Sequence, residues 1–154
     1  MLQDMSPTLA WGRRAFVCLM FLAVATAGPA LAQSLPSDDE QDVLVISTLI
    51  SFNDANLTGN YSVLRARASQ QFQEQVSIKQ LEKEFDVFRK NNIDIAAVAI
   101  SELVPDDEGA IDKNGVLRLS GYVDMETMRV VYVFKYVRNG GAWKLLSMDV
   151  RAKN

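Results

Sequence analysis

The sequence predicts an α+β domain in which three helices pack on one face of a mainly antiparallel, four-stranded sheet. Two observations lead to this fold class. The first half of the chain, up to Lys90, holds capped segments in which apolar residues recur at helical spacing. The second half holds β-branched and aromatic runs divided by turn residues, and it ends in a hairpin pattern. A sheet with one apolar face must be covered on that face, which is where we expect the helices.

The first helix is predicted from its start signal. Ser37 and Glu40 form a capping-box pattern, and acidic residues follow at the positive end of the helix dipole. The apolar run 43–52 would also suit a buried strand, but the cap decides for a helix that runs to about Leu57. We expect this helix to be the most buried of the three.

Two further helices and one connection follow. Residues 61–69 are predicted as a short second helix, and residues 69–76 as a connection anchored by Phe72. A second capping box at Ser77 opens a third helix over residues 78–90. Its apolar stripe is expected to cover the sheet and consists of Ile78, Leu81, Phe85 and Phe88.

Four strands complete the fold. Residues 93–104 are apolar and predict a first long strand. The turn signal 112–115 precedes a second strand over residues 116–125. The runs 128–138 and 142–150 form the terminal hairpin. The turn 112–115 does not match a calcium-binding loop, because Leu117 stands where such a loop needs glycine.

The register of the hairpin follows from which face it buries. A three-residue loop, Asn139–Gly141, gives one almost wholly apolar face, whereas a two-residue loop, Asn139–Gly140, places polar groups on it. Burying each large apolar side chain stabilises the fold by roughly 1.5–3 kcal/mol, so we favour the three-residue loop. The favoured register places Tyr136 opposite Lys144, Phe134 opposite Leu146, Tyr132 opposite Met148 and Val130 opposite Val150.

Residues 1–32 have the pattern of a cleavable signal peptide. Two arginines precede the apolar stretch 15–27, and Ala30-Leu31-Ala32 supplies the small-residue cleavage pattern before Gln33. The stretch is too short for a membrane-spanning helix, which needs roughly 20 residues, so we expect no stable membrane anchor. We therefore expect a periplasmic or secreted protein with a linker, 33–36, and a single domain, 37–154. The paired arginines leave general and twin-arginine export open.

Composition excludes several functions. The chain has a formal net charge of −3 and no long basic run, which argues against nucleic-acid binding. It has no histidine, and its one cysteine, Cys18, lies in the expected signal peptide. Zinc or copper sites built from His or Cys and catalysis by Ser-His-Asp or Cys-His are thus excluded from the expected mature domain. We expect no metal and no cofactor.

The order of elements resembles the nuclear transport factor 2-like superfamily, a cone in which helices pack in a curved sheet. The resemblance rests on four segments of the region Ser37 to Arg151, namely 53–57, 59–61, 68–72 and 141–145. It implies the same cone for this chain. It does not imply one activity, because this fold hosts isomerases, dehydratases, binding modules and interaction domains.

The function predicted from these observations is an exported, non-catalytic module that binds a small apolar ligand or a protein partner. The motivating feature is a wall of aromatic side chains, for which core filling is the competing explanation. A cavity of roughly 300 Å³ or more would be needed for the ligand interpretation. The candidate ligand-binding residues are Phe52, Tyr61, Phe85, Phe88, Tyr132, Phe134 and Tyr136.

The sequence also allows two other functions. An acid–base isomerase or dehydratase without histidine would use Asp124 as an inward base, with Tyr122 and Tyr132 stabilising negative charge. A homodimer would form through the other face of the hairpin, because an apolar patch on a sheet is often a contact site. The candidate interface residues are Val131, Val133, Trp143 and Leu145.

Overall fold

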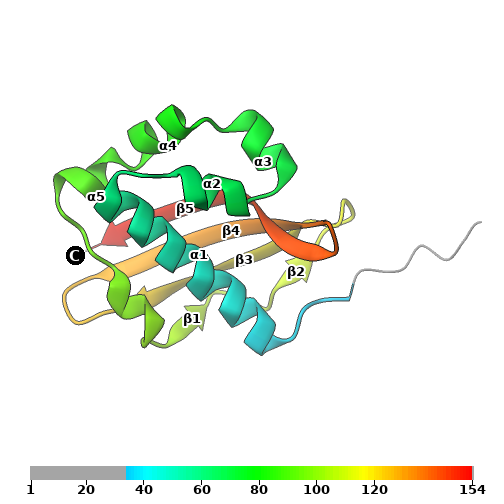
Figure 1. Ribbon diagram of the computed structural model, residues 1–154. Helices are drawn as coiled ribbons and strands as arrows, with labels where there is room; N and C mark the ends of the chain where they lie inside the picture. The colour runs from blue at the N-terminus through cyan, green and yellow to red at the C-terminus, as the bar shows by residue number, and fades with distance from the viewer. Residues whose placement is uncertain (1–33, 154) are drawn as a thin grey trace, which may run out of the picture. The chain divides into compact units, whose positions relative to one another are not determined.

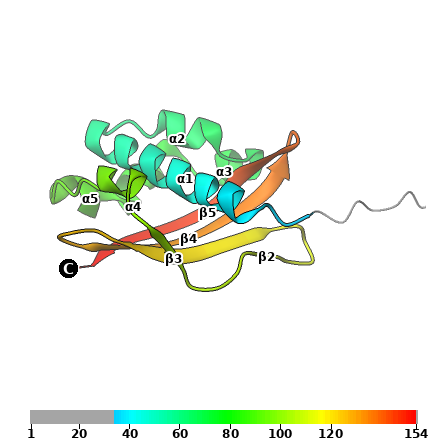
Figure 2. The ribbon, with the colours of Figure 1, turned by 90° about the horizontal axis from the view of Figure 1, so that it is seen from below.

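The computed structural model describes residues 34–153, and within them helices cover one face of an antiparallel sheet (Figures 1 and 2). The helices are α1 (Asp38–Thr58), α2 (Ser62–Arg67), α3 (Gln70–Gln75), α4 (Ile78–Glu84), α5 (Asp86–Lys90) and the 3-10 helix η1 (Ala96–Ala99). The strands are β1 (Leu103–Pro105), β2 (Ala110–Ile111), β3 (Leu117–Asp124), β4 (Arg129–Asn139) and β5 (Ala142–Lys153). The α+β class is confirmed. The predicted signal peptide and Gln33 lie outside the described residues.

Helix α1 begins and ends as its sequence predicts. The Ser37 backbone N–H donates to Glu40 Oε2 at 2.9 Å, and the Glu40 N–H donates to Ser37 Oγ at 3.3 Å. These two bonds are the reciprocal capping box. Gly59 ends the helix with φ 70°, a left-handed conformation that glycine adopts without steric cost.

The remaining helices differ from the prediction in two places. The connection predicted over residues 69–76 contains helix α3, because the Ser69 hydroxyl caps it by accepting from the Phe72 N–H. The predicted third helix is broken at Phe85 into α4 and α5. The break leaves the Glu82 carbonyl without a helical partner, and the Arg89 guanidinium donates to it at 2.6 Å. Phe72 is buried, as expected.

The prediction of a first long strand over residues 93–104 is wrong. This segment forms η1 and only the three-residue strand β1. Asp94 Oδ1 accepts from the Ala96 N–H at 2.9 Å, and the Ile95 N–H donates to the Asn53 side chain at 2.9 Å. The backbone donors that a strand would use are thus taken by a local turn and by α1.

The sheet has the order β1-β3-β4-β5, with β2 also paired to β3, and every pairing is antiparallel. The predicted four strands are therefore five, because β1 and β2 both pair with the same edge of β3. Strand β3 alternates as its sequence predicts: Leu117, Leu119 and Val123 are buried. Gly121 takes the remaining inward position, opposite Tyr132.

The favoured hairpin register is also wrong. Gly140 and Gly141, with φ 62° and 81°, form a two-residue turn, and Asn139 pairs with Ala142. Two positive φ values in succession suit the twist of a hairpin, which explains this turn. A β-bulge then shifts the register between Lys135 and Tyr136. The resulting pairs are Tyr136 with Leu145, Phe134 with Met148, Tyr132 with Val150 and Val130 with Ala152.

The bulge changes which side chains share a face near the turn. Leu145 is buried opposite Tyr136, whereas the favoured register placed Lys144 there. Beyond the bulge, Val150 faces the core as predicted. An extra residue in the strand, rather than in the loop, therefore keeps the apolar face continuous.

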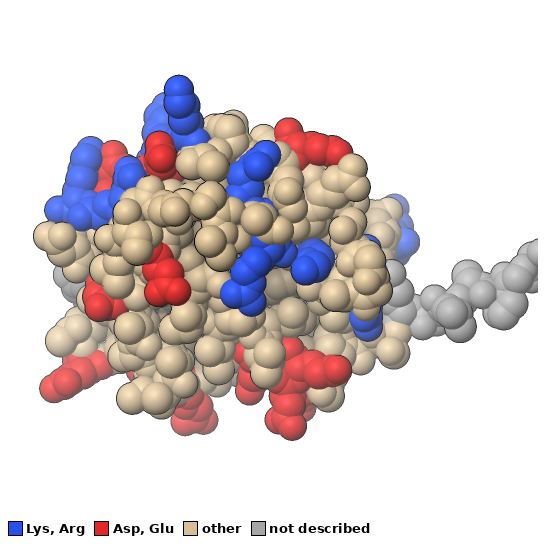
Figure 3. All heavy atoms as spheres, in the orientation of Figure 1, with Lys and Arg blue, Asp and Glu red and all other residues tan. Residues whose placement is uncertain are grey.

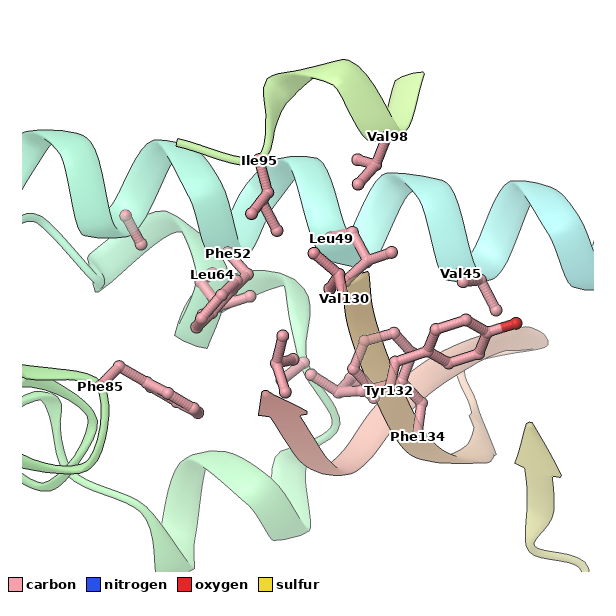
Figure 4. Close-up of a cluster of buried hydrophobic side chains, with 14 of the residues drawn as sticks. Val45, Leu49, Phe52, Leu64, Phe85, Ile95, Val98, Val130, Tyr132 and Phe134 are labelled. Atoms are coloured by element: carbon pink, nitrogen blue, oxygen red, sulfur yellow. The ribbon is translucent and has the colours of Figure 1, made fainter. Parts of the chain in front are cut away.

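The core lies between the helices and the sheet (Figure 4). Phe52 of α1 is fully buried and meets the rings of Phe85 and Phe88 edge-on, with centroids 4.7 and 4.9 Å away. Tyr132 and Phe134 stack at 5.4 Å from β4. Edge-to-face and offset contacts are the favourable geometries for aromatic rings, so these side chains hold each other in place.

Gly121→Ala is expected to destabilise the fold by about 3 kcal/mol. A Cβ at this position would lie 2.3 Å from the Val104 carbonyl oxygen and 2.8 Å from the Tyr132 hydroxyl oxygen. Backbone atoms of a paired strand move little, so the clash cannot be relieved cheaply. Urea unfolding measures the loss. Gly59→Ala is the control, because its Cβ meets nothing within 4 Å and adds only left-handed strain of about 1 kcal/mol. Equal losses in the two variants would contradict the steric explanation.

Asp94→Asn is expected to lower the free energy of unfolding at pH 7. The Ala96 N–H and the Asn53 amide stabilise the charged carboxylate and hold the pKa of Asp94 below its usual value of 3.8. A lowered folded pKa supplies stability above the unfolded pKa, and this stability disappears as pH falls through the folded pKa. The difference from wild type should therefore shrink towards about pH 2. Urea unfolding at both pH values, with exposed Asp54→Asn as control, tests this. An equal loss at both pH values would exclude a role for the charge.

Candidate functional site

The seven aromatic residues predicted to bind a ligand lie in the hydrophobic core. Each is at most 6% exposed, and the rings contact one another; Tyr132 and Tyr136 also border two smaller cavities at the edge of the core. A groove of about 420 Å³ between α4, α5 and β5 reaches only Phe85 and Phe88 of the seven. Core filling therefore accounts for this set of residues.

The proposed acid–base trio is not assembled. Asp124 is exposed and forms an ion pair with Arg129 at 2.6 Å, and the Arg129 guanidinium lies 4.0 Å from the centre of the Tyr122 ring. The bond from Arg129 lowers the pKa of Asp124, which is opposite to the shift expected for a base at neutral pH. Tyr132 is buried on the other face of the sheet. The prediction that these three residues share a site is wrong, because side chains alternate along β3 and β4.

Tyr132 instead faces a carboxylate of α1. Burial raises the pKa of Tyr132 to about 12, with Asp42 and Asp106 adding to the effect. Figure 4 shows its hydroxyl on the side of Val45, at the opposite end of the cluster from Phe85. Burial and the neighbouring Asp39 and Asp38 raise the pKa of Asp42 in turn. Both residues line a cavity of about 180 Å³ at the amino end of α1.

The predicted interface residues do not share a face. Val131 and Val133 are half-buried and alternate with the core residues Val130, Tyr132 and Phe134, so they lie on the other face of the sheet. Leu145 is buried opposite Tyr136, and Trp143 pairs with Arg138 on the same side as Leu145. The placement of all four residues on one face is wrong, because it followed from the three-residue loop.

Trp143 and Leu145 instead help to form a cavity of about 140 Å³ between α1, α2 and the β4–β5 hairpin, which we call the hairpin cavity. Its floor is made of buried core residues, and its mouth carries hydroxyl and cationic side chains. The lining residues from the helices are Leu44, Ser47, Thr48, Ser51, Leu64, Arg67 and Ala68, the last directly following α2; those from the hairpin are Tyr136, Trp143, Lys144 and Leu145. A backbone bond of 2.9 Å from the Ser69 N–H to the Leu145 carbonyl joins the two sides.

Hydrogen bonds order the helical side of the hairpin cavity. The Tyr136 hydroxyl donates to the Leu44 carbonyl at 3.0 Å and lies 3.0 Å from Thr48 Oγ1. Because Tyr136 gives its hydrogen to Leu44, Thr48 is the donor in the second bond. The Ser51 hydroxyl donates to the Ser47 carbonyl at 2.8 Å and accepts from Arg67 Nη1 at 2.9 Å. The serine bonds thus hold the Arg67 guanidinium at the mouth.

Trp143 lies on the strand side of the hairpin cavity, and its indole N–H has no hydrogen-bond acceptor among residues 34–153. The Nε1 atom is buried. A buried N–H without an acceptor is unfavourable, so native proteins contain few of them. The Arg138 guanidinium lies 4.7 Å from the centre of the Trp143 ring and donates to the Gly141 carbonyl at 2.7 Å. The indole is therefore held by the hairpin turn, next to a second positive charge.

The chain's charges are unevenly placed around this region. Among residues 34–153, no aspartate or glutamate lines the hairpin cavity. Figure 3 shows Lys and Arg side chains in the middle and at the upper left of one face, and Asp and Glu side chains along its lower edge and at several places on its left and upper parts. Neither Arg67 nor Lys144 forms a salt bridge with another residue of 34–153.

Two further findings concern the part of the chain that the structure describes. No group of three or more His, Cys, Asp or Glu side chains there is arranged to hold a metal ion. None of its helices combines the length and the apolar character that crossing a membrane requires.

Comparison of the chain with protein-family models, with curated proteins and with solved structures finds no match. The choice of the candidate site therefore depends only on the geometry of this chain. Sequence reasoning did not single out Arg67, Ser51 or Thr48. A signal was present, since hydroxyl residues at positions 47, 48 and 51 interrupt the apolar run of α1.

Tyr136→Phe is expected to cost about 1–2 kcal/mol of stability, because it leaves the buried Thr48 hydroxyl without its partner and removes one of the two side-chain bonds to the Leu44 carbonyl, which keeps the bond from Ser47. Thr48→Val should cost a similar amount. The double variant should cost less than the sum of the two, since both groups of one bond are then gone. Urea unfolding of the four proteins gives the coupling energy. Strictly additive losses would show that the two hydroxyls do not interact.

Proposed function

We propose that the chain is an exported, non-catalytic binding module of the nuclear transport factor 2-like kind, and that it takes a small ligand in the hairpin cavity. This cavity of about 140 Å³ is smaller than the roughly 300 Å³ that a drug-sized ligand needs, so the proposed ligand has only a few non-hydrogen atoms. Export rests on the pattern of residues 1–32. The fold assignment is supported by the order of helices followed by a strand meander, and by helices that cover one face of the sheet. The aromatic core is closed, so the proposed site lies at its edge and not within it.

One observation carries the choice of site. Residues lining the hairpin cavity include Arg67, which forms no salt bridge with another residue of 34–153, and Trp143, whose indole lies beside the guanidinium of Arg138. Binding sites of small molecules combine apolar walls with a few well-placed polar groups. Leu44, Leu64 and Leu145 provide the walls here.

A binding function is favoured over catalysis by the positions of the acid–base candidates. Asp124 is held by Arg129 on the exposed face, and Tyr132 lies on the buried face. Asp42, which adds to the raised pKa of Tyr132, lines that cavity together with three other acidic side chains. No basic or hydroxyl nucleophile with an activating partner accompanies them in that lining.

A homodimer through the open face of the sheet is a second candidate. Val131 and Val133 are half-buried in the centre of that face, and two ion pairs, Arg129 with Asp124 and Arg151 with Asp149, lie beside them. A self-complementary patch with an apolar centre and charged edges suits a two-fold contact.

Native mass spectrometry of the protein purified from the exported fraction of its own cells tests the proposal. We expect a mass above that of the polypeptide, released on collisional activation as a small molecule. Refolding from urea should remove this mass and shift the indole N–H resonance of Trp143, which Trp143→Phe identifies. The same spectrum reports monomer or dimer.

The control is Arg118→Ala, which removes a positive charge from the outward face of β3 and should keep the added mass. A clean polypeptide mass, together with an unchanged Trp143 resonance after refolding, would refute ligand binding in the hairpin cavity.

A further inference from the structure

The cavity of about 180 Å³ at the amino end of α1, which we call the acidic cavity, shares no lining residue with the hairpin cavity. Among residues 34–153, no lysine or arginine lines it. Four of its lining residues carry carboxylates, namely Asp38, Asp42, Asp107 and Glu108. Acidic side chains at a surface are well hydrated, so their number alone does not indicate a ligand.

The acidic cavity also holds a hydroxyl group without a partner. Tyr132 is only 2% exposed, yet its hydroxyl forms no hydrogen bond with another residue of 34–153. The other two buried tyrosines are both bonded, Tyr61 to Asn56 and Tyr136 to Thr48. Because polar groups at this depth nearly always have a partner, the Tyr132 hydroxyl is the observation that points to a ligand.

The surroundings of Tyr132 place its hydroxyl at the acidic cavity. Figure 4 shows this hydroxyl on the side of Val45, which lines the cavity together with Tyr132. The hydroxyl oxygen and the Cα of Pro105, another lining residue, both lie 2.8 Å from where a Cβ on Gly121 would stand. The oxygen is not one of the fully enclosed unpaired side-chain atoms of residues 34–153, which are Arg89 Nε, Ser120 Oγ and Trp143 Nε1. It therefore meets the open space of the cavity.

The groups that face this space are mainly acceptors. An ionised carboxylate only accepts hydrogen bonds, and a tyrosine hydroxyl can accept as well as donate. Asp107 lies 3.6 Å from the Arg118 guanidinium, whereas the other three carboxylates form no ion pair within residues 34–153. A ligand for these groups must present donors. A positive charge on it would add charge-assisted hydrogen bonds, which are stronger than neutral ones.

Asp42 would gain from such a charge. Burial, with the neighbouring Asp39 and Asp38, raises the pKa of Asp42 above its usual value of 3.8. Both causes disfavour the charged carboxylate, and a bound cation would oppose both. The positive end of the α1 dipole repels a cation, but it amounts to about half a charge, whereas each ionised carboxylate carries a full one.

The walls indicate what kind of cation fits. Val45 and Leu119 are buried apolar residues of the lining. The carboxylates are not arranged to hold a metal ion, since no group of three or more in residues 34–153 has that geometry. An ammonium group joined to a short hydrocarbon chain presents N–H donors and a charge at one end and apolar surface at the other.

We infer that the acidic cavity binds the ammonium group of a small organic amine, with the Asp42 carboxylate and the Tyr132 hydroxyl as its acceptors. The hydrocarbon chain of the amine contacts Val45 and Leu119. This second site goes beyond the proposed function and does not depend on it, because the two cavities have different linings.

Calorimetry at constant ionic strength tests the inference with three probes that share one hydrocarbon chain. Butylammonium should bind saturably and shift the backbone N–H resonances of Val45 and Leu119. The uncharged 1-butanol should bind about tenfold or more weakly. Butyltrimethylammonium, which keeps the charge but has no N–H donor, should also bind about tenfold or more weakly.

Two variants test the acceptors. Asp42→Asn and Tyr132→Phe should each weaken butylammonium binding about tenfold. Asp54→Asn makes the same change elsewhere on α1, outside the lining, and should leave binding unchanged. Because the Tyr132 hydroxyl has no protein partner, Tyr132→Phe should keep the wild-type midpoint of urea unfolding. Lost binding in this variant then reports the hydroxyl and not a loss of fold.

Each other outcome overturns the inference at a defined point. Equal binding of butylammonium and 1-butanol refutes a cation site. Equal binding of butyltrimethylammonium refutes recognition through N–H donors, and tighter binding of Ca²⁺ refutes the amine as ligand. If Asp54→Asn weakens butylammonium as much as Asp42→Asn does, or if neither acceptor variant weakens it, the amine is held only by the general acidity of the protein. None of these outcomes bears on the hairpin cavity, which native mass spectrometry tests separately.

Discussion

The structure depends on the buried face of α1, where three polar side chains each fasten a different part of the chain. Thr48 bonds to Tyr136 of β4, Asn53 bonds to Asp94 and to the Ile95 N–H, and Asn56 accepts from the Tyr61 hydroxyl. A buried polar group is costly unless it is paired, so each bond specifies one position of its partner. The apolar residues between them, such as Leu49 and Phe52, supply the burial energy but tolerate more than one arrangement.

These anchors explain why the aromatic residues form a core and not a pocket. With α1 held against β4 by Thr48, the rings of Phe52, Phe85 and Phe88 meet at close range and fill the space. Space lined by polar groups is left where the covering elements end, beside the hairpin turn and at the amino end of α1. The hairpin cavity differs from the second one in charge, because carboxylates line only the latter.

Sequence patterns predicted α1 and α4, whose capping hydrogen bonds are local, but missed α3, whose cap at Ser69 is also local. The boxes at Ser37 and Ser77 cap α1 and α4, and the alternation of β3 is as predicted. The break at Phe85 was not predictable from periodicity, because the apolar stripe continues at helical spacing across it. The strand prediction for residues 93–104 failed for a related reason. The composition of this segment suits a strand, but the Ile95 N–H donates to Asn53, which is far away in the sequence.

The sequence by itself determined the excluded chemistry and the starts of α1 and α4. The sequence contains no histidine, and this excludes the chemistry that depends on it. A capping box joins residues only three positions apart, so its pattern is visible in the sequence. Only the tertiary structure decided the hairpin register, since the Gly140–Gly141 turn and the bulge together satisfy both the turn geometry and the buried face. It also brought Arg67 and Trp143 into the lining of one cavity, because the backbone bond from Ser69, two residues after Arg67, to Leu145 of β5 joins segments that are far apart in the sequence.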